Sequence, residues 1–149
     1  MLGIGKNTPE GGVVIGKSGE NQALEPFSVA EGYSTKASGI SGAHAEGRGT
    51  WAEGESSHAE GRDTHAEGFA AHAEGWGTVA KGNTSHVSGR YNIIDDTVTT
   101  ANPKGTYAVI VGKGDSDTTR SNAYTLDWAG NGWFAKGISS GNDGESTLV

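Results

Sequence analysis

The sequence has no cysteine and few large aliphatic side chains. The absence of cysteine excludes a disulfide framework and any thiolate metal site. Hydrophobic residues make up only 33% of the 149 residues, which is too few for a conventional two-layer core. No apolar run approaches the roughly 18 residues that a membrane-spanning helix needs. We therefore expect no membrane insertion, and a fold that requires little apolar volume per residue.

Basic residues are also scarce. The chain carries 11 Lys and Arg against 18 Asp and Glu, for a formal net charge of -7. No cluster of basic residues stands out, so we do not expect nucleic acid as a partner. Four Trp, four Tyr and three Phe argue against a disordered chain.

Glycine is abundant instead, and it recurs at regular steps. The phrase Ala-Glu-Gly occurs at 30–32, 45–47, 52–54, 59–61, 66–68 and 73–75, with variants at 37–39, 80–82 and 87–89. The step is seven residues, with a single step of eight between Gly39 and Gly47. A coiled coil would need large apolar residues at two positions of each heptad, where this repeat has Ala and Gly. Collagen would need glycine at every third position.

A β interpretation fits the repeat. Each unit reads as a strand of about four residues, such as 57–60, followed by a turn that opens with a glycine such as Gly61. Side chains alternate along a strand, so Ala59 points to one side and His58 and Glu60 to the other. The inside must be narrow, because only Ala, Gly, Ser and Thr are available to fill it. We expect the glycines to supply turns with positive φ.

The histidines indicate that two units form one coil of fourteen residues. His44, His58, His72 and His86 are spaced fourteen apart, and alternate units carry Trp51, His65 and Val79 instead. Such coils stack by parallel hydrogen bonding, as in solenoids. At about 4.8 Å per strand, roughly four coils would stand about 20 Å tall.

The unit Ser57-His58-Ala59-Glu60-Gly61 resembles the YadA-like head repeat of trimeric autotransporter adhesins. It keeps the Ser, Ala and Gly of that repeat, and it has His and Glu at the two outward positions where the family has Val and Ile. The His-Ala-Glu-Gly variant is similar to repeats in phage and prophage tail proteins of Gram-positive bacteria. The resemblance implies an all-β, left-handed parallel β-roll in an intertwined homotrimer, so a partner of the chain would be a further copy of itself.

The rest of the chain divides around the repeat. We expect an N-terminal β cap segment at 1–28, the roll at 29–90, a C-terminal β module at 91–138 and a flexible tail at 139–149. In the module, strands are predicted at 107–111, 123–128 and 132–135, with a hairpin turn at 129–132. The stretch 110–132 resembles a module that follows fibre repeats in phage tail and prophage surface proteins.

Two groups of side chains are candidate binding residues. Trp76 and the arginines Arg48, Arg62 and Arg90 each follow a glycine of the His-bearing units, so they should line one edge of the roll. This edge could contact glycan or support contacts between subunits, and we favour the latter. The ladder of His44, His58, His72 and His86 would lie beside Glu46, Glu60 and Glu74. Imidazole and carboxylate groups suit a transition metal, but a polar face or subunit interface is the favoured interpretation, so no metal and no cofactor are expected.

No catalytic site is expected. Residues 11–18 match the phosphate-binding pattern Gly-x-x-x-x-Gly-Lys-Ser/Thr, but the Val-Val-Ile at its centre predicts a strand rather than a loop, so the match is attributed to chance. Every His belongs to the repeat, and no carboxylate pair in a groove is recognisable. We expect a structural or adhesive fibre segment of a phage tail or prophage-encoded surface fibre, located at the virion tail or the cell surface. The alternative is a bacterial adhesin head that binds host glycan or matrix, and a polysaccharide-degrading tail spike is less favoured.

Overall fold

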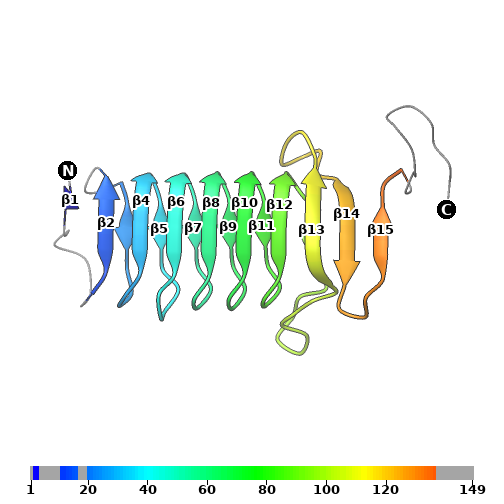
Figure 1. Ribbon diagram of the computed structural model, residues 1–149, viewed down its shortest axis with the longest axis horizontal. Coiled ribbons are helices and arrows are strands. Elements are labelled where there is room, and N and C mark those ends of the chain that lie inside the picture. The colour runs from blue at the N-terminus through cyan, green and yellow to red at the C-terminus, as the bar shows by residue number, and fades with distance from the viewer. Residues whose placement is uncertain (1, 4–10, 17–19, 137–149) are drawn as a thin grey trace.

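The computed structural model describes residues 2–3, 11–16 and 20–136, and they form a parallel β-solenoid of about five turns (Figure 1). Within these ranges there is no helix long and apolar enough to cross a membrane. The expected flexible tail at 139–149, and Lys17 and Ser18 of the phosphate-loop match, lie outside the described residues.

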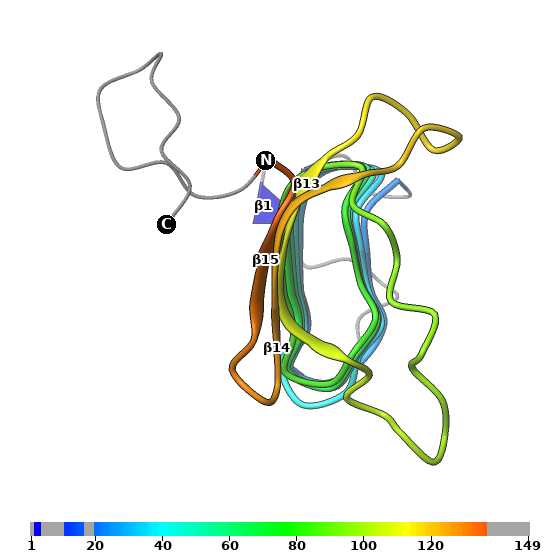
Figure 2. The ribbon, with the colours of Figure 1, turned by 90° about the vertical axis from the view of Figure 1, so that its right-hand side faces the viewer.

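Each coil contributes one long and one short strand, which form the two walls of a flattened tube (Figure 2). The long strands of the stack are β2 (Val13–Gly16), β4 (Val29–Tyr33), β6 (His44–Arg48), β8 (His58–Arg62), β10 (His72–Trp76) and β12 (His86–Arg90). The short strands are β3 (Gln22–Ala23), β5 (Lys36–Ala37), β7 (Trp51–Ala52), β9 (His65–Ala66) and β11 (Val79–Ala80). Neighbouring coils pair in parallel in both walls.

The register confirms the predicted fourteen-residue coil. His44 stands opposite His58, and His58 opposite His72, so equivalent residues of successive coils are neighbours. The one eight-residue step is taken up between β5 and β6, in the turn that contains Gly42, where φ is 89°. The ladder is back in register at His44, which pairs with Val29. An extra residue is thus tolerated in a turn, where it does not shift the stack.

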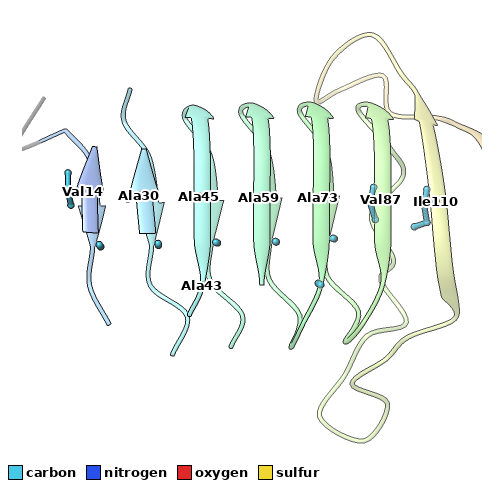
Figure 3. Packing of buried hydrophobic residues seen from close by; sticks show 14 residues of the cluster. Val14, Ala30, Ala43, Ala45, Ala59, Ala73, Val87 and Ile110 are labelled. Carbon is cyan, nitrogen blue, oxygen red and sulfur yellow. The ribbon is translucent and has the colours of Figure 1, made fainter. Parts of the chain in front are cut away.

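The interior consists of columns of small side chains. Figure 3 shows the column on the long strands, in which alanine occupies the middle coils and Val14, Val87 and Ile110 occupy the ends. Both walls contribute buried alanines, which are Ala23, Ala30, Ala37, Ala45, Ala52, Ala59, Ala66, Ala73 and Ala80. A column of threonines, Thr35, Thr50, Thr64 and Thr78, is also buried. The prediction that the small side chains face inward is therefore confirmed.

Asparagine replaces threonine at both ends of the buried threonine column. Asn21 donates to the carbonyl oxygen of Gly32 at 2.7 Å and accepts from the backbone N–H of Thr35 at 3.1 Å. Asn92 accepts from the N–H of Val79 at 2.8 Å and donates to its carbonyl oxygen at 3.1 Å. A side-chain amide offers the same donor and acceptor as a peptide group, so it satisfies backbone groups that a further coil would otherwise pair.

The parallel stack extends past the predicted limits of 29–90. Strands β2 and β3 form the first coil within the segment 1–28, because they pair in register with β4 and β5. β1 (Leu2–Gly3) pairs antiparallel with β2. At the other end, β13 (Tyr107–Lys113) pairs in parallel with β12.

Antiparallel strands follow the last parallel strand. β14 (Asn122–Asp127) pairs with β13, and β15 (Gly132–Phe134) pairs with β14. The predicted hairpin is therefore present, and β2 and β15 lie at opposite ends of the stack (Figure 1).

The connection between β12 and β13, residues 91–106, is organised around the buried side chain of Asp95. Its carboxylate accepts hydrogen bonds from the hydroxyl and backbone N–H of Thr97, and from the N–H groups of Thr106 at 2.7 Å and Tyr107 at 3.1 Å. Burial raises the pKa of Asp95, but these hydrogen bonds outweigh burial and hold the pKa below its ordinary value of 3.8.

The repeat glycines meet two different requirements. Those that end the long strands have positive φ, for example 104° at Gly61, as expected, and a Cβ at Gly61 would also lie 2.3 Å from the carbonyl oxygen of Gly75. Those that follow the short strands, such as Gly68, do not have positive φ, and there the expectation was wrong. A Cβ at Gly68 would lie 2.3 Å from the carbonyl oxygen of Gly82 in the next coil. Glycine is needed there because the stacked backbones leave no room for a side chain.

Two substitutions separate crowding from backbone conformation. Gly68→Ala should lower the free energy of unfolding by at least about 3 kcal/mol, the upper end of ordinary overpacking, because backbone cannot move aside cheaply. Gly130→Ala is the matched control, since Gly130 has a φ of 90° but open space around it. It should cost only about 1–2 kcal/mol, the conformational penalty alone. Denaturant unfolding at equal protein concentrations measures both, and a smaller loss for Gly68→Ala contradicts the steric interpretation.

Asp95→Asn should lower the free energy of unfolding by about 1–3 kcal/mol, because the amide group turns a donor toward backbone donors and leaves one of them unpaired. The folded-state pKa lies below the unfolded value, so the ionised carboxylate stabilises the fold above about pH 4, and this contribution is lost as pH falls through the folded-state pKa. The difference in unfolding free energy between wild type and Asp95→Asn, measured by urea denaturation, should therefore decrease below about pH 4. Asp96→Asn, at an exposed position, should change stability by less than about 0.5 kcal/mol. If the difference in unfolding free energy between wild type and Asp95→Asn is the same at all pH values, the ionised carboxylate does not stabilise the fold in this way.

Candidate functional site: the His–Glu face and the Arg–Trp edge

One outer face of the long-strand wall carries imidazole and carboxylate groups in every middle coil. We call it the His–Glu face, and its members are His44, Glu46, His58, Glu60, His72, Glu74 and His86. These residues flank the buried side chains of Ala45, Ala59, Ala73 and Val87, so the alternation of a strand turns them outward. All are half-buried or exposed.

The imidazole rings stack on one another, as the fourteen-residue period predicts. The ring centroids are 4.7 Å apart for His44 and His58, and 4.8 Å apart for each of the next two pairs. The rings of the first two pairs are nearly parallel, with interplanar angles of 4° and 10°. The last pair, which involves His86, is tilted by 31°. The spacing is that of the strands, so the backbone ladder imposes the ring ladder.

Glutamate carboxylates lie beside the stacked imidazoles and can offset the repulsion between them when the imidazoles are protonated. Nε2 of His72 lies 3.4 Å from a carboxylate oxygen of Glu60, and Nε2 of His86 lies 3.4 Å from one of Glu74. In both pairs the Glu belongs to the preceding coil. His44 instead lies 3.7 Å from Glu46 of its own coil. The sequence placed these groups on one face but did not reveal that the pairing crosses between coils.

His58 has the least favourable place for a positive charge. Burial lowers its pKa, and the neighbouring imidazoles of His44 and His72 lower it further, while Glu60 and Glu46 act in the opposite direction. The net result is a pKa below 6.5, so His58 is neutral near pH 7.

Several polar atoms of this face are shielded from solvent without making a hydrogen bond of good geometry, although carboxylates lie near two of them. Nε2 of His44, His58 and His72 has almost no contact with solvent, and among the described residues it finds no hydrogen-bond partner of good geometry. Covered polar atoms without partners are rare in folded proteins and are unfavourable. The shielded nitrogens therefore make the His–Glu face a candidate binding surface.

The second candidate group forms a continuous column, the Arg–Trp edge, made of Tyr33, Arg48, Arg62, Trp76 and Arg90. The register places these residues opposite one another at the ends of successive long strands. The last four were expected here from the sequence, and Tyr33, which follows Gly32 and precedes them in the column, was not.

Cation–π contacts hold the Arg–Trp edge together. The guanidinium groups of Arg62 and Arg90, from the coils on either side, lie 4.7 Å and 5.2 Å from the centre of the Trp76 ring, and Arg48 lies 6.0 Å from that of Tyr33. Each contact is worth about 0.5–1 kcal/mol at an exposed site. Because two arginines cover its ring, Trp76 offers little free surface for stacking on a sugar. The guanidinium groups of Arg62 and Arg90 also contact the carboxylates of Asp63 at 3.3 Å and Asp115 at 3.6 Å, respectively. The arginines are exposed, so an anion that binds there competes with these two carboxylates.

The short-strand wall presents a different surface. The rings of Trp51 and His65 contact each other at a tilt of 43°, with 4.7 Å between their centroids, and the ammonium group of Lys36 lies 5.3 Å from the centre of the Trp51 ring. A hollow of about 380 Å³ lies beside His65 and is lined in part by Tyr91 and Arg120. Arg120 was not singled out from the sequence, because it comes from the connection between β13 and β14.

No protein-family model matches the chain, and neither a curated protein nor a solved structure is significantly similar to it. The comparisons therefore leave the family unassigned. What the structure gives is the β-solenoid with its fourteen-residue coil.

Proposed function

We propose that the chain is a segment of a fibre, from a phage tail or a prophage-encoded surface fibre, that acts as a trimeric spacer or receptor-binding part without catalysis. The observation that carries this proposal is the in-register stack of near-identical coils with an interior of alanine and threonine. A stack of this kind adds length in one direction and contacts only its neighbours. Such a structure is suited to holding a binding end at a distance.

A left-handed roll in a homotrimer is the form that the YadA-like resemblance implies, and the exposed surface supports the association of several copies. Large apolar side chains stand exposed along the solenoid, with 70% exposure at Phe27, 55% at Tyr33 and 51% at Ile40. The alanine columns bury little apolar area in one chain. Association around a rotation axis would cover further apolar surface and close the assembly.

The trimer is tested by light scattering on the untagged protein after size exclusion. We expect a mass three times the 15.2 kDa of the chain, maintained on dilution to the low micromolar range. A mass of one chain under these conditions contradicts the trimer. A small-angle scattering profile of an elongated particle would support the spacer role, and that of a compact sphere would oppose it.

An adhesin that binds glycan is the second candidate function, and the Arg–Trp edge is the observation that favours it. A column of arginines on a protein of net charge -7 offers a local site for an acidic group. The sugars concerned would carry carboxylate or phosphate groups, since both faces of the Trp76 ring are engaged.

The adhesin is tested with an array of acidic and neutral glycans. Arg62→Ala should reduce binding to the acidic members by about tenfold or more, as for a hot-spot arginine. Trp51→Ala, on the other wall, is the control and should leave binding unchanged. Absence of binding to any acidic glycan, or equal losses in the two variants, argues against the adhesin and leaves the spacer role.

A further inference from the structure

The His–Glu face brings three metal-ligating side chains together at its N-terminal end. One ligand atom each from His44, Glu46 and His58 lies within 4.8 Å of the other two. His44 and Glu46 belong to β6 and His58 to β8, so the register of two neighbouring coils fixes the cluster. Residues of a single chain are sufficient to form it.

The surroundings of two imidazole nitrogens favour a bound cation. Nε2 of His44 and Nε2 of His58 are shielded from solvent and have no hydrogen-bond partner among the described residues. The nearest carboxylate oxygen to Nε2 of His44 is that of Glu46 at 3.7 Å, too far for a hydrogen bond. Two shielded imidazole nitrogens without hydrogen-bond partners are unfavourable as they stand, and a cation between them and the carboxylate would satisfy all three groups at once.

The donor set is chemically selective. Two imidazole nitrogens and one carboxylate oxygen are a ligand set that zinc takes at open sites, where a fourth position is left for water or another ligand. Imidazole also suits copper, nickel and cobalt, whereas calcium and magnesium require oxygen ligands. An ion bound at about 2.1 Å in tetrahedral geometry needs donors about 3.4 Å apart. From separations of up to 4.8 Å, the donors must therefore approach by up to about 1.4 Å. The two imidazole rings, now stacked with an interplanar angle of 4°, must also turn about their side-chain bonds so that the in-plane lone pairs of their nitrogens converge on the ion, while the backbone stays in register.

We propose that His44, Glu46 and His58 bind a divalent transition-metal ion of the Zn²⁺ class. The sequence favoured a polar face or a subunit interface at this position. The covered nitrogens and the convergence of three donors from two coils, neither of which sequence spacing can show, reverse that preference. The site goes beyond the proposed fibre function and does not depend on a second copy of the chain. An ion at this place crosslinks two coils and stabilises the stack by binding only its folded form.

Two other clusters have the same residue types but a poorer donor set. Glu60, His72 and Glu74 supply one imidazole and two carboxylates, and so do Glu53, His65 and Glu67 on the short-strand wall. With fewer nitrogen donors they should bind transition metals more weakly than the cluster with two imidazoles. His86 belongs to none of the three clusters although it stacks in the same ladder, and it serves as an internal control.

The experiment uses the full chain without an affinity tag, treated with a chelator that is then removed. Titration with Co²⁺ reports ligand geometry through its visible absorption, and Zn²⁺ competition gives the affinity. Wild type should show one tight site with a tetrahedral or five-coordinate spectrum, and Zn²⁺ should raise its Tm. His44→Ala and His58→Ala should each weaken that site by more than about 100-fold, beyond the loss caused by removing an outer-shell partner. His86→Ala should match wild type.

Glu46→Gln provides a second variant of nearly unchanged shape, in case an alanine variant does not fold. It should also weaken binding, and circular dichroism checks that each variant keeps its β structure. The proposal is overturned if wild type binds neither Co²⁺ nor Zn²⁺ saturably, or if affinity is equal in wild type and all three ligand variants. Equal weakening by His86→Ala overturns it as well. Light scattering on the same samples measures the number of chains per particle. A trimer that does not bind metal contradicts only the metal site, and a monomer that binds metal contradicts only the trimer.

Discussion

Parallel backbone hydrogen bonding between successive coils is the constraint on which the rest of this structure depends. The bonds hold equivalent residues opposite one another, so any change in coil length must occur where no ladder is made. The turn containing Gly42 accommodates the one extra residue of the roll. At the turns after the short strands, carbonyl oxygens of one coil approach the next so closely that Gly68 and its equivalents cannot carry a side chain.

Because of this register, the same side chain in successive coils forms a regular column. Inside, identical methyl and hydroxyl groups stack into columns, which explains how a chain with 33% hydrophobic residues forms a core. Outside, the same repetition places like groups about 4.8 Å apart. Stacked imidazoles resist protonation together, and the low pKa of His58 follows in part from its two histidine neighbours. Carboxylates from adjacent coils offset that repulsion, and arginines around the Trp76 ring join neighbouring coils in a similar way.

A stack of identical coils needs ends that differ from its middle, because unpaired strand edges invite unwanted pairing. Asn21 and Asn92 end the threonine column, and their side-chain amides form hydrogen bonds with backbone groups of the adjacent coil. Larger side chains, Val14 and Ile110, close the alanine column. At the C-terminal end the direction of pairing reverses at β14. These features make the ends part of the same folded unit as the middle coils.

The sequence by itself determined the coil length, the inward alanines and the alignment of the histidines, because a strand alternates with period two and His44, His58 and His72 repeat every fourteen residues. It also indicated the hairpin of β14 and β15. Only the tertiary structure decided where the stack begins, since β2 lacks the Ala-Glu-Gly phrase and joins through its hydrogen bonds. The carboxylate pairing across coils and the covered nitrogens of the His–Glu face likewise depend on side-chain rotation between neighbours, which residue spacing does not specify.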